Sequence, residues 1–357
     1  MIRWKSILVT TLLMVLPLTA CETPAPTPPA NSQAPSSPAA TTSRLETVKS
    51  RGKLICGVDG GIPGFSYVDQ DGKYSGIDVD VCRAVAAALF NDPNAVEYRN
   101  LDSTERFTAL SSGEVDMLAR NTTWTISRDT SVGLEFAPTT FYDGQGMMVR
   151  ADSGIKTLKD LQGKSVCVES GTTSELNLTD NLRKQAVEAE TVTFQQAEPA
   201  YAAYAEGRCD GITSDKSQLV ARRSNLPNPE EHILLEVTMS KEPLGPVTIN
   251  NDSAWFDAVK WVTYALIEGE ELGITQANVD EMKTSTDPTI KRFLGIEGDL
   301  GKGMGLSNDF AYNVIKQVGN YGEVYDRNLG EKSQFKLPRG QNDLWTNGGL
   351  LYSPPFR

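Results

Sequence analysis

The stretch GQGMMVR, residues 144–150, separates two parts of the chain that follow the same order of elements. It is typical of an extended crossing rather than of a helix. A second extended stretch, residues 244–250, follows the second part. Two strand-like connections are what a hinge between two lobes needs. The sequence therefore predicts an α/β protein with two lobes joined by two strand-like crossings.

Each part contains a series of strands and helices. In the first, Asp78 is expected to cap a helix that runs to Phe90 with Val81 and Val85 on its apolar face. In the second, the capping box TTSE at 172–175 opens a helix. The expected strands are 53–58, 96–98, 115–119, 164–169, 191–195 and 210–214. Repeated units of this kind predict largely parallel sheets in both lobes.

The same pattern predicts how the chain is divided. The expected parts are a signal peptide at 1–20, a tether at 21–43, a first lobe at 44–146 with 247–357, and a second lobe at 147–246. A long amphipathic helix is expected at 254–272. The residues after this helix are rich in glycine and aromatic side chains, and we expect them to pack back onto the first lobe.

The first twenty residues have the features of a lipoprotein signal peptide. Arg3 and Lys5 form a basic start, and the apolar run 6–18 is short for a membrane span. The run ends in Leu-Thr-Ala-Cys, and lipoprotein processing requires small residues before a cysteine. We expect Cys21 to be lipidated and to anchor the protein to a membrane. The alternative is an ordinary signal peptide with an incidental cysteine.

Composition limits the partners. Residues 22–43 are nearly all Pro, Ala, Ser and Thr, which predicts an extended tether. The remaining composition is that of a globular protein. The net charge is −12, and it becomes −14 without Arg3 and Lys5, the two charges of the signal peptide. A negative field repels phosphate backbones, so we do not expect a nucleic-acid partner.

Four cysteines remain in the mature chain. An even number in an exported chain predicts two disulfides, with three possible pairings. We favour Cys56 with Cys82 and Cys167 with Cys209, because each pair would join a strand to an element of the same layer; four free buried thiols are the alternative. Because there is no Cys-x-x-Cys spacing and His232 is the single histidine, we expect neither a metal site nor a cofactor.

Several motifs resemble those of one protein family. GIDVD at 76–80, the segment 121–128, SGTTSE at 170–175 and the segment 209–215 occur in the order found in type II periplasmic binding proteins for amino acids. The phrases RNTTWTISRDTS, YDGQGMMV, VCVESGTTSELNL and SKEPLGP resemble the general L-amino-acid-binding proteins of the AapJ/BztA type, which bind glutamate, glutamine, aspartate and asparagine. The resemblance covers roughly residues 45–357. It implies the two-lobed type II fold, the Venus flytrap.

The resemblance implies that one arginine of the first lobe binds the α-carboxylate of an amino acid. Arg128, five residues after Thr123, matches this arginine. A guanidinium suits the task because it binds both carboxylate oxygens at once. Thr123 and Asn121 would add hydrogen bonds from the same loop. The alternative for Arg128 is a solvated surface side chain.

In the second lobe, Thr172 and Thr173 lie where a strand gives way to a helix. Free N–H groups and the helix dipole make such a point an anion site that could close over the same carboxylate. A helix cap without ligand contact is the alternative. Asp215, at the end of a buried strand, matches the family's acid for the ligand ammonium; it could instead only cap the next helix.

The resemblance also implies which residues recognise the ligand side chain. Ser103 and Arg106 match a serine and an arginine that hold the distal carboxylate in similar glutamate/aspartate binders. A histidine of some relatives is replaced by Ala197, so we expect a broader polar range than glutamate alone. Asp59 and Phe65, on a glycine-rich loop, are candidate pocket walls, and Phe65 could equally belong to the core.

These observations predict a lipid-anchored monomer on the periplasmic or extracytoplasmic face of a membrane. It would capture a polar L-amino acid and present it to the membrane subunits of an ABC importer. The main alternative is an enzyme on the same fold, such as a cyclohexadienyl dehydratase, although no Ser–His or Cys–His pairing supports it. A ligand-sensing receptor module is a further alternative, and it would normally precede a transmembrane segment.

Overall fold

The first lobe is built around a five-stranded mixed sheet. A computed structural model describes residues 43–357, so the predicted signal peptide, Cys21 and the tether up to residue 42 lie outside the described residues. The strands β1 Leu54–Val58, β5 Val96–Asn100, β6 Met117–Leu118, β7 Leu134–Phe136 and β14 Val247–Ile249 lie in the order β5-β1-β6-β14-β7. β1 is parallel to β5 and β6, whereas β14 is antiparallel to β6 and β7.

Helices and a small sheet complete this lobe. They are α1 Arg44–Arg51, α2 Ile77–Phe90, α3 Arg106–Ser112, α4 Ile126–Thr130, β2 Gly61–Ile62, β3 Ser66–Val68 and β4 Tyr74–Ser75. The prediction that Asp78 caps α2 is wrong, because the helix begins after Gly76 and has no side-chain cap. Asp78 is buried instead, and its carboxylate accepts a hydrogen bond of 3.0 Å from the backbone N–H of Asn121.

The second lobe has its own mixed sheet, in the order β10-β9-β11-β8-β12 with β13 beside β8. Its strands are β8 Phe141–Arg150, β9 Ser165–Glu169, β10 Glu190–Phe194, β11 Gly211–Asp215, β12 His232–Leu234 and β13 Lys241–Leu244. Its helices are η1 Leu158–Leu161, α5 Thr173–Gln185, α6 Ala197–Ala205, α7 Lys216–Arg223 and η2 Pro229–Glu231. The predicted parallel arrangement holds for β10, β9 and β11, but β8 runs antiparallel to β11.

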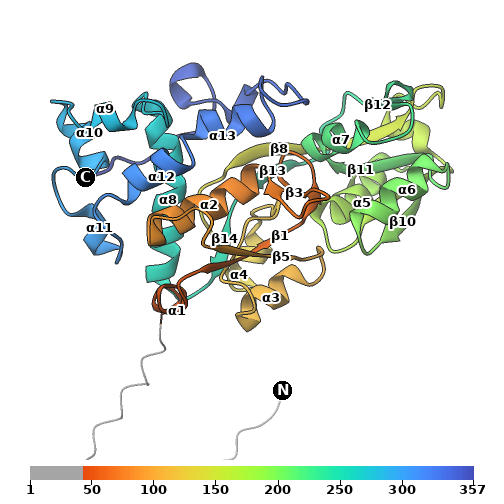
Figure 1. Ribbon diagram of the computed structural model, residues 1–357. Coiled ribbons are helices and arrows are strands. Elements are labelled where there is room, and N and C mark those ends of the chain that lie inside the picture. The colour runs from red at the N-terminus through yellow and green to blue at the C-terminus, as the bar shows by residue number, and fades with distance from the viewer. Residues whose placement is uncertain (1–42) are drawn as a thin grey trace, which may run out of the picture. The chain divides into compact units, whose positions relative to one another are not determined.

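Two adjacent strands connect the lobes, β8 and the β13–β14 segment. Phe141 at the start of β8 packs in the first core, and Met147 and Val149 farther along it pack in the second. Leu244 of β13 pairs with Phe141 and also lies in the first core. β8 therefore carries side chains into both cores, and Figure 1 shows it passing between the two groups of elements.

The C-terminal part packs against the first lobe. α8 Ser253–Glu271 contacts α2, and α12 packs against both of them. The other elements are α9 Val279–Met282, α10 Pro288–Phe293, α11 Leu300–Gly303, α12 Phe310–Gln317, α13 Tyr321–Asn328, η3 Gly340–Asn342 and η4 Trp345–Asn347. Figure 1 shows this blue segment beside α2 and α8. Trp255 and Tyr321 are fully buried here, so the segment enlarges one continuous core.

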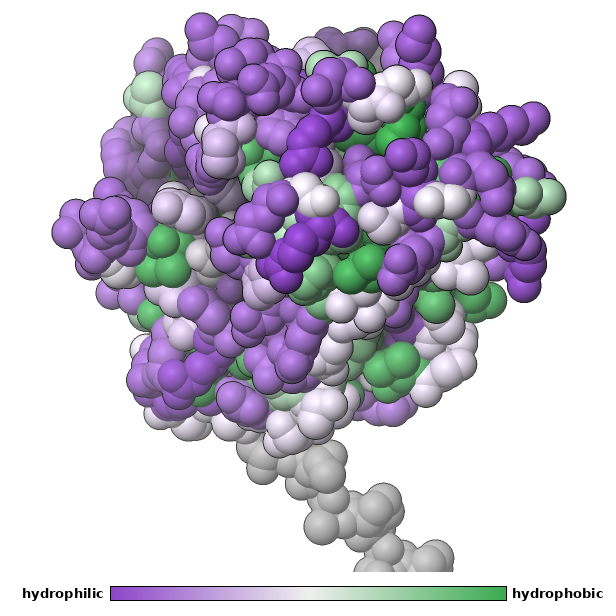
Figure 2. Space-filling view, turned by 90° about the vertical axis from the view of Figure 1, so that its right-hand side faces the viewer, coloured by the Kyte–Doolittle hydropathy of each residue, from purple (hydrophilic) through white to green (hydrophobic). Residues whose placement is uncertain are grey.

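Each lobe contains one disulfide. Cys56 of β1 is bonded to Cys82 of α2, and Cys167 of β9 is bonded to Cys209 just before β11. This is the pairing favoured from the sequence. Within residues 43–357, no helix is both long enough and apolar enough to span a membrane. The face in Figure 2 is mostly hydrophilic, with apolar side chains in small separate groups, which is ordinary for a surface in contact with water.

Candidate ligand-binding site

A small polar cavity lies between the lobes. From the first lobe it is lined by Ser103, Arg106, Arg120, Asn121 and Thr123, and from the second by Glu169, Thr172, Thr173, Ser174, Ser214, Asp215 and Gln218. The first-lobe residues come from the segment before α3, from the first residue of α3 and from the loop after β6. The second-lobe residues come from the ends of β9 and β11 and from the helices that follow. Both sets therefore lie at the carboxyl ends of parallel strands, where ligands of α/β sheets bind.

The lobes are in direct contact around this cavity. The Thr123 and Thr173 hydroxyl oxygens are 3.3 Å apart, and Arg120 Nη2 lies 3.5 Å from Glu169 Oε1. Gly171, at φ +73°, lets the loop before α5 approach the first lobe, because a Cβ there would lie 3.1 Å from Thr104 Cγ2. The structure thus shows a closed arrangement of the lobes.

Several polar atoms at the cavity are buried without a hydrogen-bond partner among residues 43–357. They are Ser103 Oγ, Arg106 Nε and both amide atoms of the Asn121 side chain. Asn121 is held at φ +42° by the hydrogen bond from its N–H to Asp78, whose pKa burial raises to about 7. Each unpaired buried group costs on the order of 1–3 kcal/mol. Such a cluster indicates a polar ligand that supplies the missing partners.

The first-lobe side of the site is cationic. Arg128 Nη1 donates to the Thr123 carbonyl at 2.8 Å, and its guanidinium lies 5.2 Å from the centre of the Phe107 ring. The Arg106 guanidinium lies 4.8 Å from the same ring. Burial lowers the pKa of Arg128 to about 10. Burial and the charges of Arg120 and Arg128 lower the pKa of Arg106, so an anion would be stabilised here.

The opposite side is anionic. Burial raises the pKa of Asp215, and the carboxylates of Asp143 and Glu242 raise it further. Asp143 of β8 and Glu242 of β13 are direct neighbours on the crossings between the lobes. Glu242 is fully buried and accepts hydrogen bonds from Thr173 at 2.8 Å and Asn177 at 3.0 Å. A ligand cation beside Asp215 would offset this crowding of negative charge.

The charges therefore suit a zwitterion. A carboxylate fits the arginine side and an ammonium the Asp215 side, since each ligand charge would meet the opposite sign in a site where burial strengthens the attraction. Groups of three or more His, Cys, Asp or Glu that could hold a metal ion are absent among residues 43–357. The arrangement offers binding groups of both signs for an organic ion.

The structure brings together most of the residues expected from the sequence. Ser103, Arg106, Asn121, Thr123, Thr172, Thr173 and Asp215 all line the cavity. Thr172 is also the N-cap of α5, since its hydroxyl accepts from the Glu175 N–H at 3.1 Å. Arg128 does not itself line the cavity; it is hydrogen-bonded to the carbonyl of Thr123, which does, and its charge acts on Asp215.

Two expected residues lie elsewhere. Phe65 does not line the cavity; its ring packs edge-on against Phe141 in the first core, with centroids 5.0 Å apart. Asp59 lies in an adjoining, larger cavity, where it pairs with Arg120 at 2.6 Å. Buried beside Phe141, Phe65 belongs to the first core rather than to a pocket wall.

Sequence reasoning missed six residues at or beside the cavity: Arg120, Glu169, Ser174, Ser214, Gln218 and Glu242. Arg120 directly precedes Asn121, so its place in the same loop was a usable signal. Glu242 gave a weaker one, because an acid within a strand-like crossing is unusual when that strand is buried.

Comparisons with known proteins show what the chain is similar to over most of its length. Residues 54–331 match the bacterial extracellular solute-binding proteins, family 3. The general L-amino acid-binding periplasmic protein AapJ of Rhizobium johnstonii is 52% identical over 321 residues, 89% of this chain and 94% of that protein. The glutamate/glutamine/aspartate/asparagine-binding protein BztA of Rhodobacter capsulatus is 48% identical over 320 residues, 89% of this chain and 95% of that protein.

A solved structure is similar over the same range. An ABC transporter periplasmic binding protein from Brucella ovis with glutathione bound is 50% identical, with a TM-score of 0.86. The comparison covers 89% of this chain and 100% of that chain. Together these likenesses confirm the predicted type II periplasmic-binding-protein fold with two lobes.

Proposed function

The chain belongs to the bacterial extracellular solute-binding proteins of family 3, and from this premise we propose that it is the amino-acid-binding component of an ABC importer. Its ligands in this proposal are polar L-amino acids of the glutamate, glutamine, aspartate and asparagine class. AapJ and BztA, two of the relatives with about half of their residues identical, are named for the amino acids that they bind. The membrane subunits of the importer are the proposed partner.

One observation carries the proposal: the cavity between the lobes holds buried polar atoms without partners, flanked by cations on one side and carboxylates on the other. In the proposal, Arg128 binds the α-carboxylate, with Thr123 and the N-terminal N–H groups of α5 closing over it. Asp215 binds the ammonium. Each charge of the ligand then has a fixed partner, which a buried charge requires.

Hinge closure couples binding to delivery in this account. The proposed lobes, 44–146 with 247–357 and 147–246, turn about β8 and the β13–β14 segment. A ligand that contacts both lobes stabilises the closed form by the contacts that the open form lacks. The Thr123–Thr173 and Arg120–Glu169 contacts belong to that closed form. The importer would recognise the closed protein.

Side-chain recognition is assigned to Ser103 and Arg106. Arg106 is 2% exposed, and its Nε has no hydrogen-bond partner. It therefore suits a distal carboxylate or amide oxygen. Ala197 stands where some relatives have a histidine, and it lies at the larger cavity, where it contributes no polar group. We therefore expect the amide ligands to bind in addition to the acidic ligands, but with lower affinity.

A thermal-shift panel of the twenty amino acids tests this function. Glutamate, glutamine, aspartate and asparagine are expected to raise the melting temperature, because a ligand of the folded state stabilises it by mass action.

Arg106→Gln should lower the affinity for the acidic ligands at least about fivefold more than the affinity for the amide ligands. The reason is that a hydrogen bond to a charged group is worth more than one to a neutral group. Arg99→Gln, at an exposed ion pair with Glu97, is the control and should change neither the affinity for the acidic ligands nor that for the amide ligands. A panel without any shift would refute the proposal, and equal losses for acids and amides would remove Arg106 from side-chain recognition.

Lipid anchoring at Cys21 is part of the proposal. It is supported by the basic start, the short apolar run and Leu-Thr-Ala-Cys. Cys21→Ser should move the protein from the membrane fraction to the soluble extracytoplasmic fraction without changing ligand affinity, because the anchor is separated from the first lobe by the tether. Fractionation of cells that express both forms checks this. An unchanged membrane fraction for the variant would contradict the anchor.

The Brucella relative suggests a second ligand class. Glutathione is a glutamate that is extended through its side-chain carboxyl group, and that relative has it bound. We propose that glutamates extended in this way are also ligands of this chain.

A further inference from the structure

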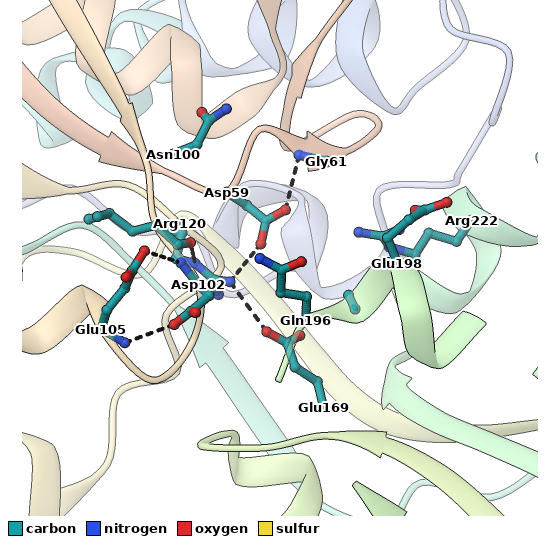
Figure 3. Close-up of a pocket in the computed structure, with 12 residues that line it drawn as sticks. Asp59, Gly61, Asn100, Asp102, Glu105, Arg120, Glu169, Gln196, Glu198 and Arg222 are labelled. Carbon is teal, nitrogen blue, oxygen red and sulfur yellow. Dashed lines mark hydrogen bonds and ion pairs between the residues drawn. The ribbon is translucent and has the colours of Figure 1, made fainter. Parts of the chain in front are cut away.

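A second, larger cavity adjoins the amino-acid site. Its volume is about 310 Å³, and Arg120 and Glu169 line both cavities. Figure 3 shows these two side chains in direct contact, with Asp59 beside Arg120 and with Gln196 and Arg222 on the second lobe. A ligand in the inner cavity could therefore extend past Arg120 and Glu169 into a partly open space lined by residues of both lobes.

Arg222, in the last turn of α7, is the cation of this cavity that has bonding capacity left. The residue is 6% exposed, and its Nε is buried without a hydrogen-bond partner in the part of the chain that the structure describes. Its guanidinium lies 5.0 Å from the centre of the Tyr201 ring. The one carboxylate paired with it, Glu198 at 2.9 Å, has a side chain that is 84% exposed and hydrated. A surface partner of that kind contributes little, so Arg222 can still bind an anion from within the cavity.

Arg222 also reaches the opposite lobe. A Cβ on Gly61, in the first-lobe loop, would lie 3.4 Å from Arg222 Nη2. A ligand group held there would contact both lobes and would add to the stability of the closed form.

The other guanidinium of the cavity is already compensated. Arg120 lies 2.6 Å from Asp59 and 3.5 Å from Glu169, and its Nε donates to the Leu101 carbonyl at 2.9 Å. Arg120 and Glu169 thus present a donor and an acceptor side by side at the passage between the cavities. An amide group matches this pair, because its carbonyl accepts and its N–H donates.

We propose that the larger cavity is a second subsite, which takes the remainder of a glutamate whose side-chain carboxyl is joined by an amide bond to another amino acid. The terminal carboxylate of that extension binds Arg222, and the amide lies alongside the Arg120–Glu169 pair. The inference rests on the proposed function, since the free α-carboxylate and ammonium stay in the inner cavity. Peptides in which the glutamate is linked through its α-carboxyl group are excluded, because that glutamate has no free α-carboxylate for Arg128.

Calorimetry of the unmodified protein with four probes tests the subsite. γ-Glutamylglycine should bind, α-glutamylglycine should bind at least about 100-fold more weakly, and the C-terminal amide of γ-glutamylglycine should lose about tenfold, as expected for a lost charged hydrogen bond. Glutamate is the fourth probe. If glutamate binds and γ-glutamylglycine does not, the subsite is refuted and the amino-acid function stands. If no probe binds, the proposed function itself fails.

A variant identifies the residue. Arg222→Gln should lower the affinity for γ-glutamylglycine about tenfold and leave the affinity for its C-terminal amide unchanged. Arg223→Gln is the matched control, since this neighbour on α7 points instead to the His232 carbonyl, at 3.5 Å. Melting curves establish that both variants fold. If Arg222→Gln weakens the acid and the amide equally, or weakens neither, Arg222 is not the carboxylate partner. Because the acid and the amide are also compared in the unmodified protein, the subsite stays testable even if the variant fails to fold.

Discussion

Replacing Arg128 with alanine is expected to lower the affinity for every amino-acid ligand about 100-fold or more. The α-carboxylate is common to all of them, and Arg128 is its proposed partner. Removing one partner of a buried, hydrogen-bonded charge pair costs about 2–5 kcal/mol, chiefly because the other charge is left buried and unpaired. Isothermal titration with glutamate and glutamine measures the loss. The two ligands should lose equally, unlike in Arg106→Gln.

Two controls separate recognition from folding. Arg128 also ties the binding loop together through its hydrogen bond to the Thr123 carbonyl, so the melting curve of the variant has to be recorded. Arg128→Lys keeps the charge but loses the two-pronged geometry, and we expect an intermediate loss. Arg99→Ala removes an exposed arginine of the same lobe and should bind normally. Full affinity in a folded Arg128→Ala protein would remove Arg128 from the site.

Asp215→Asn is expected to have two opposite effects. It should lower amino-acid affinity about 100-fold or more, because a neutral amide replaces the proposed partner of the ammonium. It should also raise the melting temperature of the ligand-free protein. Asp215 is buried near Asp143 and Glu242, and its pKa is raised, so its charge destabilises the folded state until a ligand cation arrives. Binding sites often trade stability for function in this way.

The pH dependence of stability checks the second effect. A carboxyl group with a raised pKa binds its proton more tightly in the folded state, so the free energy of unfolding falls as pH rises above the unfolded-state value of 3.8. Asp143, with a pKa raised to about 6, contributes in the same direction. Asp215→Asn should therefore make this fall shallower without removing it. Denaturant titrations between pH 4 and pH 8 measure the free energy of unfolding of both proteins. An equally steep fall in the variant would contradict the destabilising role assigned to the Asp215 charge.

Local sequence signals predicted the elements well. The helix expected at 254–272 is α8 at Ser253–Glu271, and the strand expected at 53–58 is β1 at Leu54–Val58. Thr172 caps α5 as its sequence motif indicates. Such features depend on residues within a few positions of one another, so hydrophobic periodicity and capping preferences are sufficient to find them.

The sequence did not predict which residues far apart along the chain pair with each other. Asp78 has the sequence context of a helix cap, yet its partner is the N–H of Asn121, 43 residues later. Arg120 pairs with Asp59 and with Glu169, on opposite lobes, and the second pairing exists only when the lobes meet. Neither spacing nor residue type records which buried acid faces which guanidinium. The family resemblance supplied the residues that we propose to contact a ligand, whereas the residues that hold those in place required coordinates.

The most direct test of the account is a crystal structure of the protein with L-glutamate bound. The account predicts the α-carboxylate within hydrogen-bonding distance of the Arg128 guanidinium, the ammonium within hydrogen-bonding distance of Asp215, and the side-chain carboxylate beside Arg106 and Ser103. A ligand that is reversed in this cavity, or that lies outside it in a closed protein, would contradict the account.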